Sequence, residues 1–373
     1  ALDALAAPKR AAREGADRGA LERIEAAARR LADAAGAARD EPVPATEAGA
    51  WLALAFPDRV GLRRKGEQPR YLLANGRGAA LAADAALGAS RLIVAIDVED
   101  ASPDARVRRA AALSEADLRA RFGDRVGWQR VAEWSRRERR VIAEEREGLD
   151  ALVLDRRRWT AAPPDVLARA LCEGLAAEGA ERLRALLAVP DTASSLIARV
   201  EWLRRQGGPL AERLPAMDDA TLAAEACDWL APYLTGERAP GEIAPGVLDA
   251  ALAARVGDDL AAVERAAPAA YEPPLGGKRL IDYSGETPRL TIRVQELFGE
   301  TRHPSVGEPP VALVLELTSP AGRPVQTTRD LPGFWASSYA EVAREMRARH
   351  PKHPWPDDPA AAPPTRRAKA RRS

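Results

Sequence analysis

The sequence contains few of the side chains that build metal and redox centres. Its 373 residues include two cysteines and three histidines. Cys172 and Cys227 do not have the sequence spacing of a metal or redox motif. So few cysteines are typical of a reducing cytoplasm, which is the location that we predict. His303, His350 and His353 cannot supply a zinc site unaided, so no metal site is predicted.

Long apolar runs and an excess of one charge are missing as well. No run reaches the roughly 18 apolar residues that a membrane span needs, and no signal peptide is recognisable. The formal net charge is +1, so no global field attracts nucleic acid, and any basic surface must be local. Lysine occurs only at positions 9, 65, 278, 352 and 369, so nearly all of the 56 basic residues are arginine. Together with the abundant alanine this indicates a GC-rich coding bias, and a single arginine therefore carries little information.

Motifs that bind ATP or activate a nucleophile are not recognisable. "LGGKRL" (275–280) lacks the first glycine of a phosphate-binding loop and the hydroxyl that contacts Mg²⁺. "NGRGAA" (75–80) lacks the third glycine of a dinucleotide loop and a βαβ setting, so it predicts a hairpin turn. "DYSGE" (282–286) lacks the glycine two residues before the serine of a nucleophile elbow. We therefore expect no catalytic and no cofactor-binding residue in this chain, and neither binding nor hydrolysis of ATP.

The spacing of apolar residues predicts an α+β protein with several regions. Residues 1–56 are helical in pattern. Residues 57–160 contain several short strands and one helix over Glu115–Phe122, for which an OB-like β-barrel is our choice. Residues 161–266 return to helical periodicity. Residues 267–362 alternate as strands and close with a helix, which predicts a mixed β/α unit.

The two ends of the chain carry further predictions. Leu21, Ile24, Ala28 and Leu31 are spaced to form one apolar helix face near the start. Residues 363–373 have the composition of a disordered basic tail. Because the chain begins within a helical pattern and without Met, we expect it to be a fragment.

Residues 125–159 combine arginine with tryptophan, the two residue types that suit the binding of single-stranded nucleic acid. Cations follow the phosphates, and aromatic faces stack on bases at about 1–3 kcal/mol each. An OB-like barrel could present both on one exposed face. The candidate nucleic-acid-binding residues are Arg125, Trp128, Arg130, Arg136, Arg137, Arg156, Arg157, Arg158 and Trp159; Trp134, Arg139 and Arg140 also lie in the stretch.

A second interpretation of the same stretch remains open. The tryptophans could be buried, and the arginines could pair with the acids that surround them. Those acids are Glu133, Glu138, Glu144, Glu145 and Glu147. In that case the stretch stabilises the fold and binds no nucleic acid.

The segment "FWASSYAEVAREMRARHPKHPWPDDP" (334–359) predicts a structural clasp. Ser338 and Glu341 have the spacing of a capping box, and Pro351 ends the helix after them. The prolines that follow hold the chain extended, so Trp355 can pack against the C-terminal β/α unit at small entropic cost. The predicted clasp residues are Trp335, Tyr339, His353 and Trp355. The alternative is an exposed peptide that a partner recognises through Trp355.

Several segments together resemble the C-terminal part of the bacterial HrpB-type DExH-box ATP-dependent helicases. They are "LALAFPDRVGLRR" (52–64), "RYLLANGRGAAL" (70–81), "RVEWLRR" (199–205), "IDYSGETPRLTIRVQELFGE" (281–300), "SPAGRPVQTTRDLPGFW" (319–335) and "YAEVAREMRARHPKHPWPDDP" (339–359). The resemblance implies that residues 1–56 are the last helices of the helical-bundle domain that follows the motor. The two RecA-like motor domains are not in the sequence, so no ATP-site residue can be carried over.

The resemblance implies a parent protein that uses ATP and Mg²⁺ and acts on single-stranded RNA or DNA. This chain would be its accessory C-terminal region, which binds nucleic acid and docks on its own motor domains. The competing hypothesis is a protein-interaction scaffold that binds no nucleic acid. Other protein partners are not indicated by the sequence.

Overall fold

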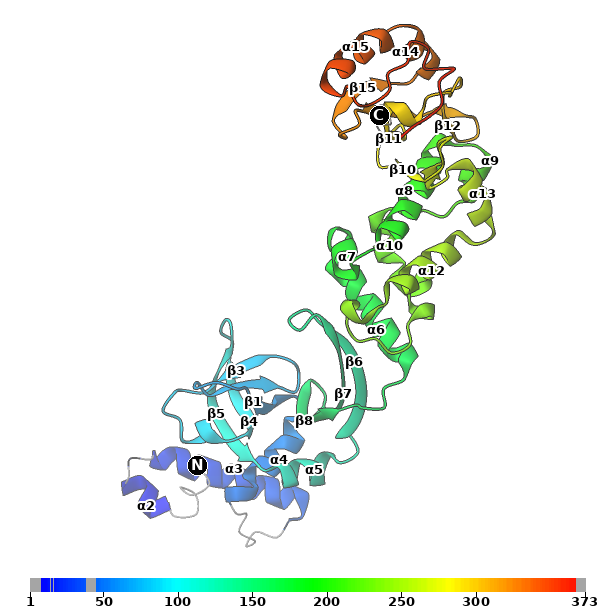
Figure 1. The fold of residues 1–373 in the computed structure, drawn as a ribbon. Helices are drawn as coiled ribbons and strands as arrows, with labels where there is room; N and C mark the ends of the chain where they lie inside the picture. Colours follow the sequence, from blue (N-terminus) through cyan, green and yellow to red (C-terminus); the bar gives the residue numbers. More distant parts are fainter. Residues whose placement is uncertain (1–7, 14, 16, 38–44, 367–373) are drawn as a thin grey trace. The chain divides into compact units, whose positions relative to one another are not determined.

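The computed structural model describes residues 8–13, 15, 17–37 and 45–366, and the chain divides by its internal contacts into two units. The first unit comprises residues 1–131 and 144–160. The second comprises residues 132–143 and 161–373. Both contain helices and sheets, so the predicted α+β multidomain class is confirmed (Figure 1).

The first unit contains a closed five-stranded barrel with the strand order β1-β2-β3-β5-β4. All of its pairings are antiparallel except that of β3 with β5. The "NGRGAA" segment is a hairpin turn between β2 and β3, as its Asn-Gly pair predicts. The strands are β1 (Val60–Arg63), β2 (Arg70–Leu73), β3 (Gly78–Ala80), β4 (Leu92–Glu99) and β5 (Ala105–Leu113).

Three further strands lie outside the barrel, and residues 132–143 of their first hairpin belong to the second unit. The strands are β6 (Gly127–Ser135), β7 (Arg140–Leu149) and β8 (Leu152–Arg158), which form a separate sheet in the order β6-β7-β8. The strands that the sequence predicts over 138–159 are therefore present, but they are not barrel strands. The turn between β7 and β8 is at Asp150, whose φ is +51°, and not at Gly148. Leu149 and Leu152 on either side of this turn join the apolar core of the barrel.

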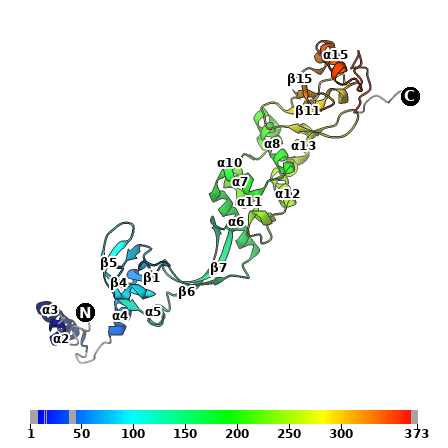
Figure 2. The same ribbon diagram turned by 60° about the vertical axis from the view of Figure 1, so that its left-hand side comes forward.

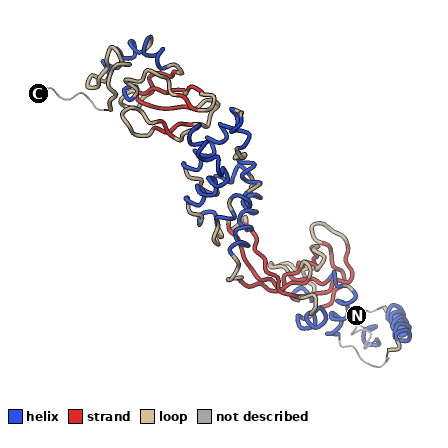
Figure 3. Tube along the Cα trace, turned by 90° about the vertical axis from the view of Figure 1, so that its right-hand side faces the viewer, coloured by secondary structure: helices blue, strands red, loops and turns tan. Residues whose placement is uncertain are grey.

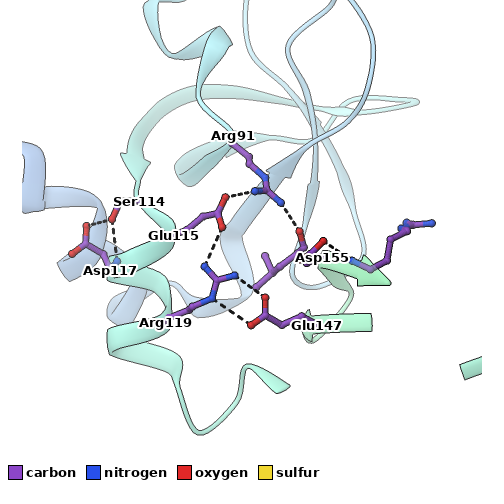
Figure 4. A network of polar contacts seen from close by, with 9 residues as sticks. Arg91, Ser114, Glu115, Asp117, Arg119, Glu147 and Asp155 are labelled. Atoms are coloured by element: carbon purple, nitrogen blue, oxygen red, sulfur yellow. Dashed lines mark hydrogen bonds and ion pairs between the residues drawn. The ribbon is translucent and has the colours of Figure 1, made fainter. Parts of the chain in front are cut away.

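An arginine–glutamate network holds the second sheet to the barrel (Figure 4). Helix α5 (Glu115–Phe122) presents Arg119, which donates to Glu115 at 3.0 Å and to Glu147 of β7 at 2.7 Å. These carboxylates raise the pKa of Arg119. Arg91, just before β4, donates to Glu115 and to the backbone oxygen of Leu154 in β8. Strands β7 and β8 are thus fixed to α5 and β4.

The helices near the start of the chain are only partly buried. They are α2 (Pro8–Arg13), α3 (Arg18–Ala35) and α4 (Ala48–Ala55). On α3, Leu21 is buried, whereas Ile24 and Leu31 are exposed. The predicted helix is therefore present, and most of its apolar face is exposed among the described residues.

A helical region opens the larger part of the second unit (Figure 3). Leu196, Val200 and Leu203 of α8 are buried, and Leu248 and Leu252 of α12 are as well, so the predicted stripes face the core. The helices are α6 (Pro164–Glu178), α7 (Ala180–Leu187), α8 (Asp191–Gln206), α9 (Pro209–Arg213), α10 (Asp219–Ala224), α11 (Ala226–Trp229), α12 (Pro245–Val256) and α13 (Leu260–Ala266).

A mixed sheet followed by two helices ends the second unit (Figure 2). Its strand order is β15-β14-β11-β10-β9, with β11 and β14 parallel and the other pairs antiparallel. The strands are β9 (Ala270–Tyr271), β10 (Arg279–Asp282), β11 (Arg289–Arg293), β14 (Val314–Thr318) and β15 (Pro324–Thr328), with a small pair β12 (Ser305–Val306) and β13 (Val311–Ala312). The helices are α14 (Leu331–Ala336) and α15 (Tyr339–Arg349).

The segment after α15 returns to the helices and is held there by backbone contacts. Helix α15 ends at Arg349, before Pro351, as predicted. Trp355 is 5% exposed, and the hydroxyl of Tyr339 donates to the carbonyl of Pro356 at 3.0 Å. Arg347 donates two hydrogen bonds to the carbonyl of Trp355, at 3.1 and 2.7 Å. This arrangement agrees with the clasp hypothesis, which a stability measurement has still to test.

Two details of the C-terminal prediction are wrong. Ser338 makes no capping hydrogen bond, because its backbone is already in the αR region and not in the extended conformation of a capping residue. Thr365 and Arg366, predicted to be disordered, contact the unit: Arg366 donates to the buried carboxylate of Glu296 at 3.0 Å. Arg279 pairs with the same carboxylate at 2.6 Å, so an unmatched buried charge is avoided. Residues 367–373 lie outside the described residues.

Candidate nucleic-acid interface

The face of the β6–β8 sheet that carries Trp128 is the best candidate for contact with nucleic acid. Trp128 is 43% exposed, and the guanidinium of Arg157 lies 4.3 Å from the centroid of its ring. The alternation of side chains along a strand explains why Trp128 and Arg157 lie together, because alternate residues of a strand project to one face. Trp128 and Arg130 share that face on β6, and Arg157 reaches it from β8.

Glu145 of β7 links the two arginines of this face. Arg130 Nε donates to Glu145 Oε1 at 3.0 Å, and Arg157 Nε donates to Glu145 Oε2 at 2.6 Å. The hydrogen bond from Arg130, and then that from Arg157, holds the pKa of Glu145 below its usual value. Since each guanidinium has five N–H donors, most of them remain for another acceptor. We call Trp128, Arg130, Glu145 and Arg157 the sheet face.

Trp159 is not a stacking platform, although the sequence predicts it as one. Its side chain is buried, with 9% exposed, directly after β8. The guanidinium of Arg130 lies 5.4 Å from the centroid of its ring. Trp159 therefore supports an arginine of the sheet face and offers little surface of its own.

The run Arg156, Arg157 and Arg158 does not act as one cluster. In a strand the middle residue projects to the opposite face from its two neighbours. Arg156 accordingly pairs with Glu144 at 3.8 Å, while Arg157 pairs with Glu145. Arg158 lies opposite Glu144 in the register and makes no ion pair with the residues that the structure describes. The sequence missed this division, which the period of two could have shown.

Other candidates lie at the two ends of the β6–β7 hairpin. Arg125 precedes β6 and pairs with Asp150 at 2.7 Å. At the hairpin tip, which belongs to the second unit, Trp134 Nε1 donates to Glu178 of α6 at 3.0 Å. Arg136 donates to the backbone oxygen of Ala177 at 2.7 Å. The tip is thus packed on α6 and belongs to a different unit from the sheet face.

The ion pairs agree with part of the second interpretation, in which the arginines of residues 125–159 pair with the surrounding acids. Arg130 and Arg157 pair with Glu145, and Arg156 pairs with Glu144, which are two of the acids that the sequence names. Arg137, at the hairpin tip, has no ion pair among the described residues. The arginines are thus partly neutralised, yet Arg130 and Arg157 remain exposed beside an exposed indole ring.

Comparisons with known proteins bear on the whole chain. A family model described as ATP-dependent helicase C-terminal (HrpB_C) matches residues 229–359. The ATP-dependent RNA helicase HrpB of Escherichia coli (strain K12) is 35% identical over 329 residues, an overlap of 85% of this chain and 39% of that protein. The crystal structure of the E. coli DExH-box NTPase HrpB is 33% identical with a TM-score of 0.51, covering 91% of this chain and 42% of the other. The predicted resemblance to the C-terminal region of HrpB-type helicases is confirmed.

The chain spans 39% of the length of the curated relative that it matches. The three longest quoted segments, 281–300, 319–335 and 339–359, all lie within the residues that the family model matches. No helix among the described residues has the length and apolar character to cross a membrane. The described part of the chain likewise holds no group of three or more His, Cys, Asp or Glu side chains placed for a metal ion.

The "LGGKRL" segment does not have the structural setting of a phosphate-binding loop. A phosphate-binding loop follows a strand and opens a helix, whereas the "LGGKRL" segment leads into strand β10. The side chain of Arg366 lies against Gly277 and donates to the carbonyl of Gly276. The space beside Gly277 is therefore already filled by the chain itself.

Proposed function

We propose that this chain is the accessory C-terminal region of an ATP-dependent helicase, and that its sheet face binds single-stranded nucleic acid. The observation that carries the proposal is the exposed ring of Trp128 with the guanidinium of Arg157 at 4.3 Å. An exposed ring can stack on a base, and the adjacent guanidiniums of Arg130 and Arg157 can contact phosphates. RNA is favoured over DNA because the E. coli relative is named an RNA helicase.

The finer parts of the proposal rest on the same comparisons. The five-stranded barrel is assigned as an OB-like barrel, a fold that commonly supports contact with oligonucleotides. The parent protein would hold ATP and Mg²⁺ in motor domains on which this region docks. A cytoplasmic location is supported by Cys172 and Cys227, which are both free thiols.

Salt-dependent binding of single-stranded RNA tests the sheet face. We expect the double change Arg130→Ala and Arg157→Ala to weaken binding of a 12-residue oligouridylate. The slope of log K against log salt should fall by up to about 1.4, because each lost phosphate contact on a single strand contributes roughly 0.7. Fluorescence anisotropy of a labelled strand between 50 and 200 mM salt measures both quantities.

The same strands supply a matched control. Arg156→Ala with Arg158→Ala removes two arginines from the opposite face of β8 and should leave the slope nearly unchanged. Both variants are made in the full chain with Arg367, Lys369, Arg371 and Arg372 changed to Ser, because these residues could bind RNA nonspecifically. Equal slopes in the two double variants would reject the sheet face. An absence of salt-sensitive binding in the parent chain would favour the scaffold function.

A further inference from the structure

A pocket of about 460 Å³ lies within the second unit, between the hairpin tip and helices α6 and α7. Its charged walls come from Arg136 and Arg139 of the tip, Glu178 of α6 and Arg182 of α7. Trp134, Ala185 and Leu186 complete the lining. We call it the tip pocket. Its size is within the range of small-ligand sites, and three guanidiniums against one carboxylate leave it with a net charge of +2.

The carboxylate of Glu178 arranges the pocket. It accepts from Trp134 Nε1 at 3.0 Å and from Arg182 Nη1 at 3.2 Å, and it lies 3.5 Å from Arg136 Nε. The hydrogen bond from Trp134 leads the interactions that lower the pKa of Glu178, so the carboxylate is charged at neutral pH. Arg136 and Arg182 are thereby both oriented toward Glu178, and each keeps further N–H donors for a ligand.

Arg139 occupies a backbone position that disfavours residues with a side chain. Its φ of +51° is in the left-handed region, where glycine is the residue of lowest cost. Strain of this kind is concentrated at functional sites. The Arg139 guanidinium makes no ion pair within the described part of the chain, although it lines a pocket that already holds two other arginines.

We propose that the tip pocket binds a phosphate group. Arginine is the side chain best suited to phosphate, because its planar fork offers parallel N–H donors to the oxygens. A tetrahedral anion between Arg136, Arg139 and Arg182 would use the donors that Glu178 leaves and would neutralise the excess charge. The phosphate comes from a single-stranded nucleic acid or from a free polyphosphate. The assignment does not depend on the sheet face, since every lining residue belongs to the second unit.

Two opposite changes in the full chain test the pocket. Arg139→Gly removes a guanidinium and also relieves the backbone strain, so the melting temperature should stay equal or rise. Affinity for sodium pyrophosphate should nevertheless fall about tenfold at low salt, the effect of one lost charge-assisted hydrogen bond. Glu178→Gln keeps an acceptor for Trp134 Nε1 but removes the competing charge, so it should tighten binding. Isothermal titration calorimetry measures both variants.

Two further variants test the pocket: Arg182→Ala removes a lining arginine, and Arg169→Ala is its control. Arg169 is exposed on α6, nine residues before Glu178, and does not line the pocket, so its loss gives the same charge change elsewhere. We expect weaker pyrophosphate binding for Arg182→Ala and wild-type binding for Arg169→Ala. Equal effects of the two variants, or unchanged binding in Arg139→Gly, would overturn the proposal.

A second probe separates the two phosphate sources. If a 12-residue oligouridylate also binds more weakly to Arg139→Gly, the tip pocket contacts a strand. If only pyrophosphate is affected, the pocket takes a free polyphosphate. A third outcome would support the sheet face and reject the tip pocket. In that case the double variant Arg130→Ala with Arg157→Ala loses oligouridylate binding, whereas Arg139→Gly binds both probes as the parent chain does.

Discussion

The sheet face and the C-terminal clasp combine the same two residue types in opposite ways. In the sheet face the guanidinium of Arg157 lies over the ring of Trp128, and the ring is 43% exposed. In the clasp, Arg347 bonds the backbone carbonyl of Trp355, and the ring is 5% exposed with its Nε1 donating to the carbonyl of His350 at 3.4 Å.

The comparison shows what separates a binding surface from an anchor. An arginine over an exposed ring retains donors and leaves apolar area in water, which a nucleic acid can cover. An arginine on a carbonyl satisfies a backbone acceptor and fixes the path of the chain. The presence of arginine and tryptophan in a segment therefore does not settle its role. The role of the segment is set by the group that the guanidinium contacts.

The largest expected effect is on stability, at the clasp. Trp355→Ala should destabilise the second unit by about 3–5 kcal/mol, the usual cost of truncating a large buried aromatic side chain. Hydrogen exchange of the amides in α15 and β11 of the full chain measures the loss locally. Trp128→Ala is the control and should leave these amides unchanged. Overlapping exchange rates in parent and Trp355→Ala would support the docking-peptide alternative.

At the sheet face the expected effect is on binding and not on stability. Trp128→Ala should weaken binding of the 12-residue oligouridylate by about 1–3 kcal/mol, the contribution of one stacked base. Its unfolding free energy should change by only about 0.5 kcal/mol, as is usual for exposed positions. Anisotropy titrations and urea denaturation measure the two quantities. If Trp128→Ala lowered stability and left the affinity unchanged, Trp128 would be a structural anchor and not a binding residue.

Trp134 provides an intermediate case, because it is packed on a helix and half-buried. A Cβ atom on Gly174 of α6 would come within 2.6 Å of Trp134 Cδ2, so Gly174→Ala should displace the ring. We expect a loss of about 1–3 kcal/mol from overpacking, reduced by the roughly 1 kcal/mol that alanine gains over glycine in a helix. Thermal melts of the full chain measure the difference.

Gly246→Ala is the matched control for Gly174→Ala. Gly246 is also helical, in α12, and no atom lies within 4 Å of the Cβ that alanine would add. The melting temperature of this variant should stay equal or rise slightly. If Gly174→Ala behaves in the same way, the hairpin tip is not held by contact between Trp134 and α6.

Much of the fold could be predicted because it depends on local patterns. The buried run at the start of β4, the Asn-Gly turn after β2 and the helix end before Pro351 each follow from neighbouring residues. The separation of the β6–β8 sheet from the barrel could not be predicted in this way. It depends on long-range pairing, including the network of Arg91, Arg119 and Glu147, which no short pattern indicates.

The candidate site was predictable in composition but not in arrangement. The sequence indicates that arginines and tryptophans share the stretch 125–159, yet it does not show which of them share a face. Trp159 is buried directly after β8. Trp134 and Arg136 contact α6 because the tip of the β6–β7 hairpin belongs to the second unit. The pairing of Arg130 and Arg157 through Glu145 requires the register of β7 and β8, which only the structure provides.

The smallest expected effect concerns Glu145, which competes with any phosphate for two arginines. Its lowered pKa means that the carboxylate is charged at pH 7 and loses this charge only as the pH falls below the ordinary range for glutamate. Ion pairs with exposed arginine side chains contribute little to stability, so Glu145→Gln should barely change it. It should tighten oligouridylate binding at pH 7 by roughly twofold to threefold, because the two guanidiniums lose a charged competitor. Glu144→Gln, which removes the same charge from the opposite face of β7, should leave the affinity close to that of the parent. Weaker binding by Glu145→Gln alone would show instead that the carboxylate positions Arg130 and Arg157 for the strand, and that its charge does not oppose the phosphates.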